Sequence, residues 1–541
     1  MNNYRSSISP IINIVSGLVS RTQIRFTDTR FAHRLIAMKP DLPIATTPKK
    51  TGAWLYFLFV VALSFFTYVY HYNSPANPFW DEPYHIASAQ KYLNGVFFME
   101  QHPPLGKLFI ALGEKITKSN AKTDEFINTD YARNITAPFS FTGYRLFPTL
   151  FGWLTAPILF LVFLFLTRSG PLSALFSFLY IFDNAQIVHS RGAMVDSTLT
   201  FFGMLMILLF LYIQRKDRED IYKFCLLSFF FGIVFGLVMT TKVVGLVLIL
   251  LFPAALWRLF PRWRKIFLFL LASTVGFVIA YVAVWQIHFA LGSRIVPELS
   301  KDGYYEASDQ TKLVLANHAN GSLQAFPILL KDALRFVMHY NGGVPRLDLC
   351  KADENGSPFF YWPFGARTVD YRWEQANTNE YRYLYLVPNP VGWGLGLLAV
   401  FLSMVLLLAP LFFQTKKRLQ DPFFLVLFLG LYLSYMIAIS RIPRVMYLYH
   451  YFLPLLFSYI LFAAVIMNLQ RIGSFVLNEQ RRVLLMTFLG FLVFAAFQFY
   501  RPFTYYEPIS NDALNRRALL PLWELSCAGC TRVSPVVVPR S

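Results

Sequence analysis

Charged residues are scarce in this chain, and their scarcity excludes most soluble folds. Only 15% of the 541 residues are charged, whereas 56% are hydrophobic and the mean hydropathy is +0.45. A soluble globular domain usually carries about 25% charged residues. The composition therefore predicts a polytopic membrane protein whose long apolar segments span the bilayer.

Cysteines and acidic residues are also few. Four cysteines cannot build a disulfide framework. Cys527 and Cys530 are the only pair close in sequence, and we expect a small disulfide or free thiols there rather than a zinc site. The 30 acidic residues leave a net charge of +19. Because the basic residues lie mostly in short loops between apolar runs, we interpret them as orienting charges and expect no nucleic-acid partner.

Eleven apolar segments predict membrane spans. They cover about residues 53–70, 144–167, 171–189, 194–213, 222–240, 243–260, 266–289, 390–413, 422–440, 445–467 and 483–499. If the amino terminus is cytoplasmic, nearly every basic cluster between them falls on the cytoplasmic side, as the positive-inside bias requires. The predicted fold class is an all-α polytopic membrane protein with about eleven transmembrane helices and two large extracytoplasmic loops.

These spans divide the chain into predicted regions. They are a basic cytoplasmic arm (1–50), a catalytic transmembrane module with spans 1–7 (51–290) that contains an extracytoplasmic loop (72–143), a second extracytoplasmic loop (291–388), a carboxy-terminal transmembrane module with spans 8–11 (389–500) and an extracytoplasmic tail (501–541).

Two adjacent carboxylates, Asp81 and Glu82, follow the first predicted span. Charged side chains at the mouth of a membrane helix are rare and usually line a polar cavity, so this pair is a functional-site hypothesis. The alternative is a cap at the membrane interface, since Pro83 suits the first turn of a following helix.

Further polar residues are predicted on the same side of the bilayer. They are His102, Arg145, Asp183, Arg191, Asp196, Lys242, Arg444 and His450, with Tyr447 and Tyr451 on the helical face of Arg444. Orientation rules disfavour the basic turn Ser440–Arg444 on that side, so we expect an anionic partner for its arginines. Arginine and lysine bind phosphate, and a carboxylate can accept the proton of an incoming hydroxyl. The set suits a transfer from a lipid phosphate ester to a water-side acceptor.

Several of these residues have structural alternatives. Arg145 and Arg191 could be interfacial anchors or salt-bridge partners, and Asp183 could pair with either of them. His85 and His189 are more typical of hydrogen-bonding residues than of ligands. A divalent ion could bind Asp81, Glu82 and His102, but the sequence does not require one, and we expect no cofactor.

Several segments, in order along the chain, resemble the protein O-mannosyltransferase family. FWDEPYHIASAQKYLNGVFFMEQHPPLGKLFIALG is similar to that family's first-loop signature, an acidic pair followed by an HPPL-K motif. IFDNAQIVHSRGAMVDSTLTFFGML, GIVFGLVMTTKVVGLVLIL and RVMYLYHYFLPLLF resemble later motifs, and SPFFYWPFGARTVDYRWE resembles the last large loop. The resemblance covers about residues 78–470.

The resemblance implies the fold of glycosyltransferases that use polyprenyl-phosphate sugars, known as GT-C. It implies inverting transfer of mannose from a polyprenyl- or dolichyl-phosphate donor to Ser or Thr hydroxyls of an exported protein. The expected partners are thus this donor, the protein acceptor and the bilayer, while a dimer stays open. Transfer to lipid A or a cell-wall glycan is an alternative, and a lipid or solute transporter is a second one.

By position, the resemblance makes Asp81 the candidate base and Glu82 its partner or a substrate contact. It implies that the donor and its phosphate are bound by Arg145, Asp183, Arg191, Asp196, Lys242, Arg444 and His450, and that His102, Pro103 and Lys107 position the acceptor or the loop. The second loop lacks the β-trefoil insert of larger members. We therefore expect a minimal, bacterial-like member in a cell membrane rather than the endoplasmic reticulum.

Overall fold

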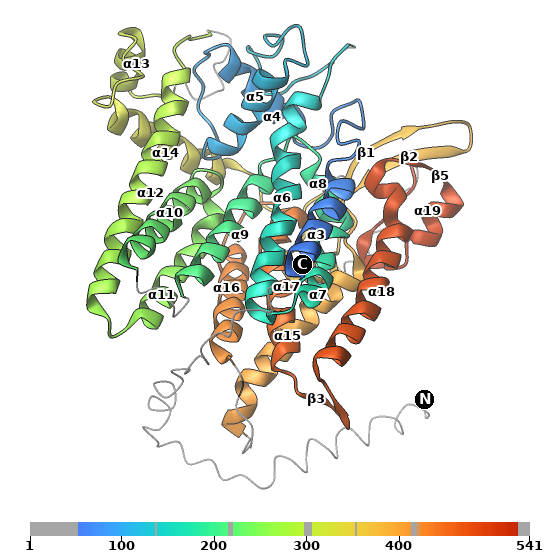
Figure 1. The fold of residues 1–541 in the computed structure, drawn as a ribbon. Helices are drawn as coiled ribbons and strands as arrows, with labels where there is room; N and C mark the ends of the chain where they lie inside the picture. The colour runs from blue at the N-terminus through green and yellow to red at the C-terminus, as the bar shows by residue number, and fades with distance from the viewer. Residues whose placement is uncertain are drawn as a thin grey trace. The chain divides into compact units, whose positions relative to one another are not determined.

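The computed structural model describes residues 52–135, 138–214, 220–296, 306–351, 354–412, 419 and 421–528, which are mostly helical (Figure 1). The predicted arm (1–50), Cys530 and the end of the predicted tail lie outside the described residues. Cys527 is disulfide-bonded.

Within the described part of the chain, eight helices are long and apolar enough to cross a membrane. They are α6 (Thr142–Thr167), α9 (Asp196–Ile213), α10 (Ile221–Met239), α12 (Trp263–Leu291), α15 (Pro390–Phe412), α16 (Pro422–Ser440), α17 (Phe452–Asn468) with the preceding 3-10 turn η3 (Leu448–Tyr451), and α18 (Glu479–Tyr505). Each coincides with a predicted span.

The other three predicted spans are helical but do not pass as straight spans. The helix α3 (Ala53–Tyr68) has only 16 residues, about 24 Å at 1.5 Å per residue. The pair η1 (Val243–Leu250) and α11 (Leu251–Leu259) is also short. The pair α7 (Gly170–Ile181) and α8 (Asn184–Ser190) is bent by 65°. The predicted count of eleven spans is therefore not confirmed.

Asp183 explains the bend between α7 and α8. Its side chain accepts a hydrogen bond of 2.9 Å from the backbone N–H of Gln186, so it caps the new helix α8. The indole of Trp393 and the hydroxyl of Tyr459 also donate to Asp183, over 2.6 and 3.0 Å. A periodicity analysis could not find this break, because apolar residues continue on both sides of it.

The remaining described elements are not candidate spans, and they form two regions and a short hairpin. The first region contains α4 (Glu82–Leu93) and α5 (Leu105–Thr117). The second contains α13 (Asp309–Ala316), α14 (Phe326–Gly343), η2 (Phe359–Phe364), β1 (Asp370–Gln375) and β2 (Glu380–Tyr385), and it joins β5 (Pro508–Ser510), α19 (Asn511–Arg517) and η4 (Pro521–Trp523) from the tail. The hairpin is β3 (Arg471–Ile472) and β4 (Phe475–Val476), which Figure 1 places at the opposite end of the bundle from α4, α5 and α13.

A small antiparallel sheet of order β1-β2-β5 stands at the same end of the bundle as α4 and α5 (Figure 1). The all-α prediction did not foresee it. The register between β1 and β2 shifts between Asp370 and Arg372, which leaves Tyr371 as the extra residue of a β-bulge. Bulges are frequent beside active sites, where they redirect a side chain.

The helix α17 forms the centre of the bundle. The span that contains it is 94% buried, whereas that of α12 is only 22% buried. A helix that is apolar all round packs in the interior, while a helix on the rim turns most of its apolar surface to lipid. The turn η3 before α17 is therefore held rigidly at the end of the bundle where α4 and α5 lie.

Candidate active site

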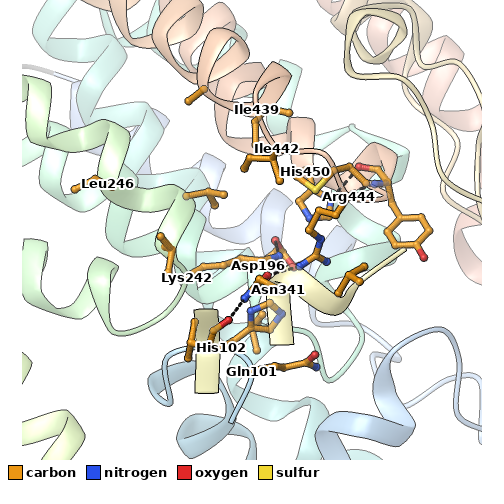
Figure 2. A pocket seen from close by; sticks show the side chains of 18 of the residues that line it. Gln101, His102, Asp196, Lys242, Leu246, Asn341, Ile439, Ile442, Arg444 and His450 are labelled. Atoms are coloured by element: carbon orange, nitrogen blue, oxygen red, sulfur yellow. Dashed lines mark hydrogen bonds and ion pairs between the residues drawn. The ribbon is translucent and has the colours of Figure 1, made fainter. Parts of the chain in front are cut away.

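A cavity of about 1050 Å³ opens where η3 meets α4, η1 and the ends of α9, α14 and α16. Its polar side is lined by Asp81, Tyr84, His85, Gln101, His102, Asp196, Lys242, Asn341, Arg346, Arg441, Arg444, Tyr447, Tyr449 and His450. Figure 2 shows how several of these side chains converge from elements far apart in sequence. Six of the twelve residues that the sequence suggested for the site line this cavity.

Asp81 lies at the cavity wall, just before α4. One of its oxygens accepts a hydrogen bond of 3.4 Å from the hydroxyl of Tyr449. Desolvation by the surrounding protein raises the pKa of Asp81, while His189 and Lys242 act in the opposite direction. A carboxylate with a raised pKa that faces a cavity is a candidate general base.

Glu82 lies beside Asp81 in the sequence but does not line the cavity. It is completely buried and receives two hydrogen bonds from the guanidinium of Arg145, of 2.7 and 2.8 Å. The backbone N–H groups of Phe79 and Ala193 also donate to it. Because four hydrogen bonds from the protein occupy its carboxylate, the geometry favours a structural role for Glu82.

Arg145 is equally buried and also lies outside the cavity wall. It donates to the backbone carbonyls of Asn73, Pro75 and Asn77, in the segment that leads from α3 to Asp81. The pair Arg145–Glu82 therefore ties this segment and the start of α4 to α6. Of the two structural alternatives for Arg145, an interfacial anchor or a salt-bridge partner, this geometry agrees with the salt-bridge partner.

Asp196 and Lys242 form an ion pair in the cavity wall, with 2.8 Å between the Lys242 Nζ and the carboxylate. The other oxygen of Asp196 lies 3.2 Å from Nε2 of His189. The Nδ1 of His189 lies 2.6 Å from the hydroxyl of Tyr371, and its ring stacks on Tyr449. One buried chain of polar contacts thus links Lys242, Asp196, His189 and Tyr371 next to Asp81.

The HPPL-K segment contributes one residue to the cavity wall, while two others that the sequence singled out are buried outside it. His102 lines the cavity, and burial and Lys242 hold its pKa well below the ordinary value. Lys107 lies outside and is buried, with its Nζ 2.7 Å from both oxygens of Glu100 and 3.0 Å from the hydroxyl of Ser88. Pro103 is buried between them and does not line the cavity.

The basic turn after α16 faces the cavity. Arg441 and Arg444 line it together with Arg346, and none of the three forms an ion pair with the described residues. Arg444 donates to the side-chain oxygen of Asn341. Three arginines without a carboxylate partner in this part of the chain are a suitable environment for an anion.

The structure corrects the predicted helical face of residues 444–451. This stretch is irregular up to Tyr447 and then forms the 3-10 turn η3, so an α-helical period does not apply. Tyr449 and His450 therefore line the cavity, whereas Tyr451 points into the core, where its hydroxyl meets that of Tyr432.

Asp183 and Arg191 lie away from the cavity. Asp183 caps α8, and Arg191 donates to the backbone carbonyls of Tyr70 and His71. The guanidinium of Arg191 also lies over the ring of Tyr505, 4.8 Å from its centroid. The structure places both as links between segments, and they do not pair with each other.

One wall of the cavity is apolar. The 3-10 helix η1 repeats every three residues, so Val243, Leu246 and Ile249 align on one face. Their side chains are 52%, 45% and 45% exposed and line the cavity, with Ile439 and Ile442 among the other lining residues (Figure 2). An apolar wall continuous with a cationic one suits an amphiphile with an anionic head.

Sequence reasoning missed several lining residues. Tyr449, Gln101 and Asn341 reach the cavity from irregular segments or from a helix end, where no periodicity marks them. Tyr371, which contacts His189, is the extra residue of the β-bulge, and no sequence pattern marks it. Within the described ranges, no group of three or more His, Cys, Asp or Glu residues could hold a metal ion.

Comparisons with known proteins agree on one family. The family model "Dolichyl-phosphate-mannose-protein mannosyltransferase" matches residues 58–294. The model "C-terminal four TMM region of protein-O-mannosyltransferase" matches residues 335–523.

Curated relatives are similar over about half of the chain. Protein O-mannosyl-transferase 2 of Danio rerio is 28% identical over 285 residues, which is 49% of this chain and 36% of the relative. Dolichyl-phosphate-mannose–protein mannosyltransferase 1 of Schizosaccharomyces pombe is 25% identical over 288 residues, which is 49% of this chain and 31% of the relative. The matched part of the chain thus spans only about a third of these relatives.

A solved structure is similar over almost the whole chain. The Saccharomyces cerevisiae protein O-mannosyltransferase Pmt1-Pmt2 complex bound to the sugar donor contains a chain that superposes with a TM-score of 0.72, at 14% identity, covering 93% of this chain and 96% of that one. This likeness confirms the predicted fold class, a multi-span GT-C glycosyltransferase fold.

Proposed function

The chain belongs to the protein O-mannosyltransferase family, and from that premise we propose that it transfers mannose from a polyprenyl- or dolichyl-phosphate donor to Ser or Thr hydroxyls of exported proteins. The observation that carries the proposal is the composition of the cavity of about 1050 Å³ described above. Among the described residues it combines a carboxylate and three arginines that form no ion pair, together with an apolar wall. These are the three groups that a lipid-phosphate sugar and a hydroxyl acceptor need.

The donor phosphate would lie between Lys242 and Arg444. Lys242 offers a point charge, and a guanidinium can give bidentate hydrogen bonds to phosphate oxygens. Arg346 and Arg441 add positive charge at the same cavity. The prenyl chain would follow Val243, Leu246 and Ile249 toward the membrane.

Asp81 would act as the base. It accepts the proton of the acceptor hydroxyl while the hydroxyl oxygen bonds to the anomeric carbon, and the bond from that carbon to the phosphate oxygen breaks. Because the attacking oxygen and the leaving phosphate are on opposite faces of the sugar, the configuration inverts. The electron pair leaves with the phosphate, whose charge Lys242 and Arg444 stabilise, so no strong acid is required.

Four residues that the resemblance assigned to the active site receive supporting roles in this proposal. Glu82 and Arg145 fix the backbone on both sides of Asp81, and Asp183 and Arg191 connect segments of the bundle. They support the site without touching the substrate. His102 and His450 remain candidates for substrate contact, since both line the cavity.

The chain is a multi-pass integral membrane protein, and we propose that the cavity opens on the extracytoplasmic side. The basic clusters predicted between the spans support this orientation. The absence of a large insert from the second loop of the sequence supports a bacterial cell membrane as its location. The yeast protein of similar fold is a complex of two chains, which supports a test for a dimer by mass measurement in detergent.

The experiment that tests this function supplies the purified protein with labelled polyprenyl-phosphate mannose and a Ser/Thr peptide. We expect labelled peptide and free polyprenyl phosphate in equal amounts. Label on lipid A or on a cell-wall glycan, with none on the peptide, would identify another acceptor. Uptake of donor into vesicles without any cleavage would instead favour a transporter.

A further inference from the structure

Tyr371 reaches the candidate active site from an element that the sequence does not connect with it. It is the extra residue of the bulge in β1, and its side chain is 5% exposed. Its ring stacks on those of Phe79 and Trp80, with centroids 5.9 and 5.2 Å away. The bulge thus places this phenol against the two aromatic residues that precede Asp81.

The hydroxyl of Tyr371 meets a histidine with two partners. Nδ1 of His189 lies 2.6 Å from this hydroxyl, and Nε2 lies 3.2 Å from a carboxylate oxygen of Asp196. His189 is 1% exposed, so water cannot replace either partner. The rings of Tyr449 and of the apolar Phe452 also contact the ring of His189, and Asp81 lies close enough for His189 to act on its pKa.

These partners allow one favourable tautomer of a neutral ring. A carboxylate only accepts hydrogen bonds, so Nε2 must carry the proton that is donated to Asp196. Nδ1 is then the acceptor, and the phenol of Tyr371 must be the donor. Burial raises the pKa of Tyr371 well above its ordinary value, so the phenol keeps the proton that it donates.

We propose that Tyr371 is a positioning residue that acts through His189 to hold Asp196 and Lys242 in the geometry that binds the donor phosphate; this inference rests on the proposed function. Asp196 accepts from Lys242 on one oxygen and from His189 on the other. If the phenol is removed, Nδ1 is left buried without a donor, and the ring can turn or exchange tautomers. Asp196 then loses its second donor, and the Lys242 ammonium is no longer fixed.

The test is a double-mutant cycle on the binding of dolichyl phosphate to the full chain in nanodiscs, with undecaprenyl phosphate measured in parallel. Tyr371→Phe keeps the ring and its stacking but removes the hydroxyl. We expect it to weaken binding about tenfold in the wild-type background and less than twofold in the His189→Gln background, because the effect passes through His189.

Tyr383→Phe on the neighbouring strand is the matched control. Tyr383 is 1% exposed, and its hydroxyl accepts a hydrogen bond of 3.0 Å from the backbone N–H of Ala528, away from the cavity. Tyr383→Phe also removes one buried phenol hydroxyl, and we expect it to change the affinity for dolichyl phosphate less than twofold. A general loss of folded protein would lower the number of binding sites without changing the affinity of those that remain.

Two results would overturn the inference. One is wild-type affinity in Tyr371→Phe, and the other is an equal loss in both backgrounds, which would mean that Tyr371 does not act through His189. Mannose transfer is measured separately on the same samples. A cycle with the expected coupling in a protein that transfers no mannose would contradict the proposed function and leave the role of Tyr371 intact.

Discussion

The guanidinium of Arg145 holds the carboxylate of Glu82 through two hydrogen bonds of 2.7 and 2.8 Å, at a site where both side chains are completely buried. Asp81, one residue away, faces the cavity and accepts from the described residues one long hydrogen bond, of 3.4 Å from Tyr449. Two adjacent acids thus have opposite environments. Glu82 fixes the backbone through Arg145, whereas the carboxylate of Asp81 faces the cavity and can meet a substrate there.

Glu82→Gln should therefore destabilise the protein. The amide cannot neutralise the buried guanidinium of Arg145, and breaking a buried ion pair costs about 3–5 kcal/mol. Thermal unfolding in detergent should show a large decrease in Tm and a corresponding loss of active protein. Asp220→Asn, which breaks the exposed pair with Lys223, is the control and should leave Tm unchanged. Equal Tm values for the two variants would contradict a structural role for Glu82.

The pH dependence of kcat/KM should report the ionisation of Asp81. A base works in its deprotonated form, so activity is present above the pKa of Asp81 and is lost as the pH falls through it. The ordinary pKa of aspartate is about 4. Because desolvation raises the pKa of Asp81, the acid limb of the profile should lie above that value. A pH profile of mannose transfer checks this.

Lys242 lowers the pKa of Asp81, which gives the profile a second test. Lys242→Gln removes that positive charge and should move the acid limb to higher pH, whereas Lys242→Arg keeps the charge and should leave the limb in place. A limb that does not move in Lys242→Gln would assign it to another group.

Leu246→Asn should weaken the use of long-chain donors. Leu246 lines the apolar wall and is 45% exposed, so an amide there would lose about 1–2 kcal/mol of contact with a prenyl chain. We expect the KM for a long-chain donor to rise roughly fivefold to thirtyfold, and the KM for a water-soluble short-chain analogue to stay constant. Leu271→Asn on α12, 51% exposed and outside the cavity, is the control. Equal effects on both donors would contradict a chain-binding role.

Much of the fold could be predicted from the sequence, because long apolar runs and the positions of basic residues determine where helices lie. Each of the eleven predicted segments overlaps one or two helices in the structure. The 65° bend was not predicted, because the polar pair Asp183 and Asn184 sits within a segment whose apolar residues continue on both sides. The 3-10 geometry of η1 could not be predicted, since it does not interrupt the apolar pattern. They depend on tertiary hydrogen bonds and packing.

The candidate site could be predicted in part. Asp81, Asp196, Lys242 and Arg444 are charged residues at span ends, where charge is costly and therefore conspicuous. Only the family resemblance separated Asp81 from Glu82; the residue types alone could not, because their difference lies in Arg145, 63 positions later. Tyr371 could not be predicted at all, since an aromatic residue in a polar loop gives no signal until the bulge places it.

The most direct test of the account is mannose transfer by Asp81→Asn. The asparagine has the same shape and keeps the hydrogen-bond acceptor for Tyr449, but it cannot accept the acceptor's proton. We expect Asp81→Asn to fold, to bind the polyprenyl phosphate as the wild type does, and to transfer mannose about 10² to 10⁴ times more slowly. Asp309→Asn, in an exposed ion pair on α13, should retain the wild-type rate. Transfer by Asp81→Asn at the wild-type rate would contradict the central claim that Asp81 is the base.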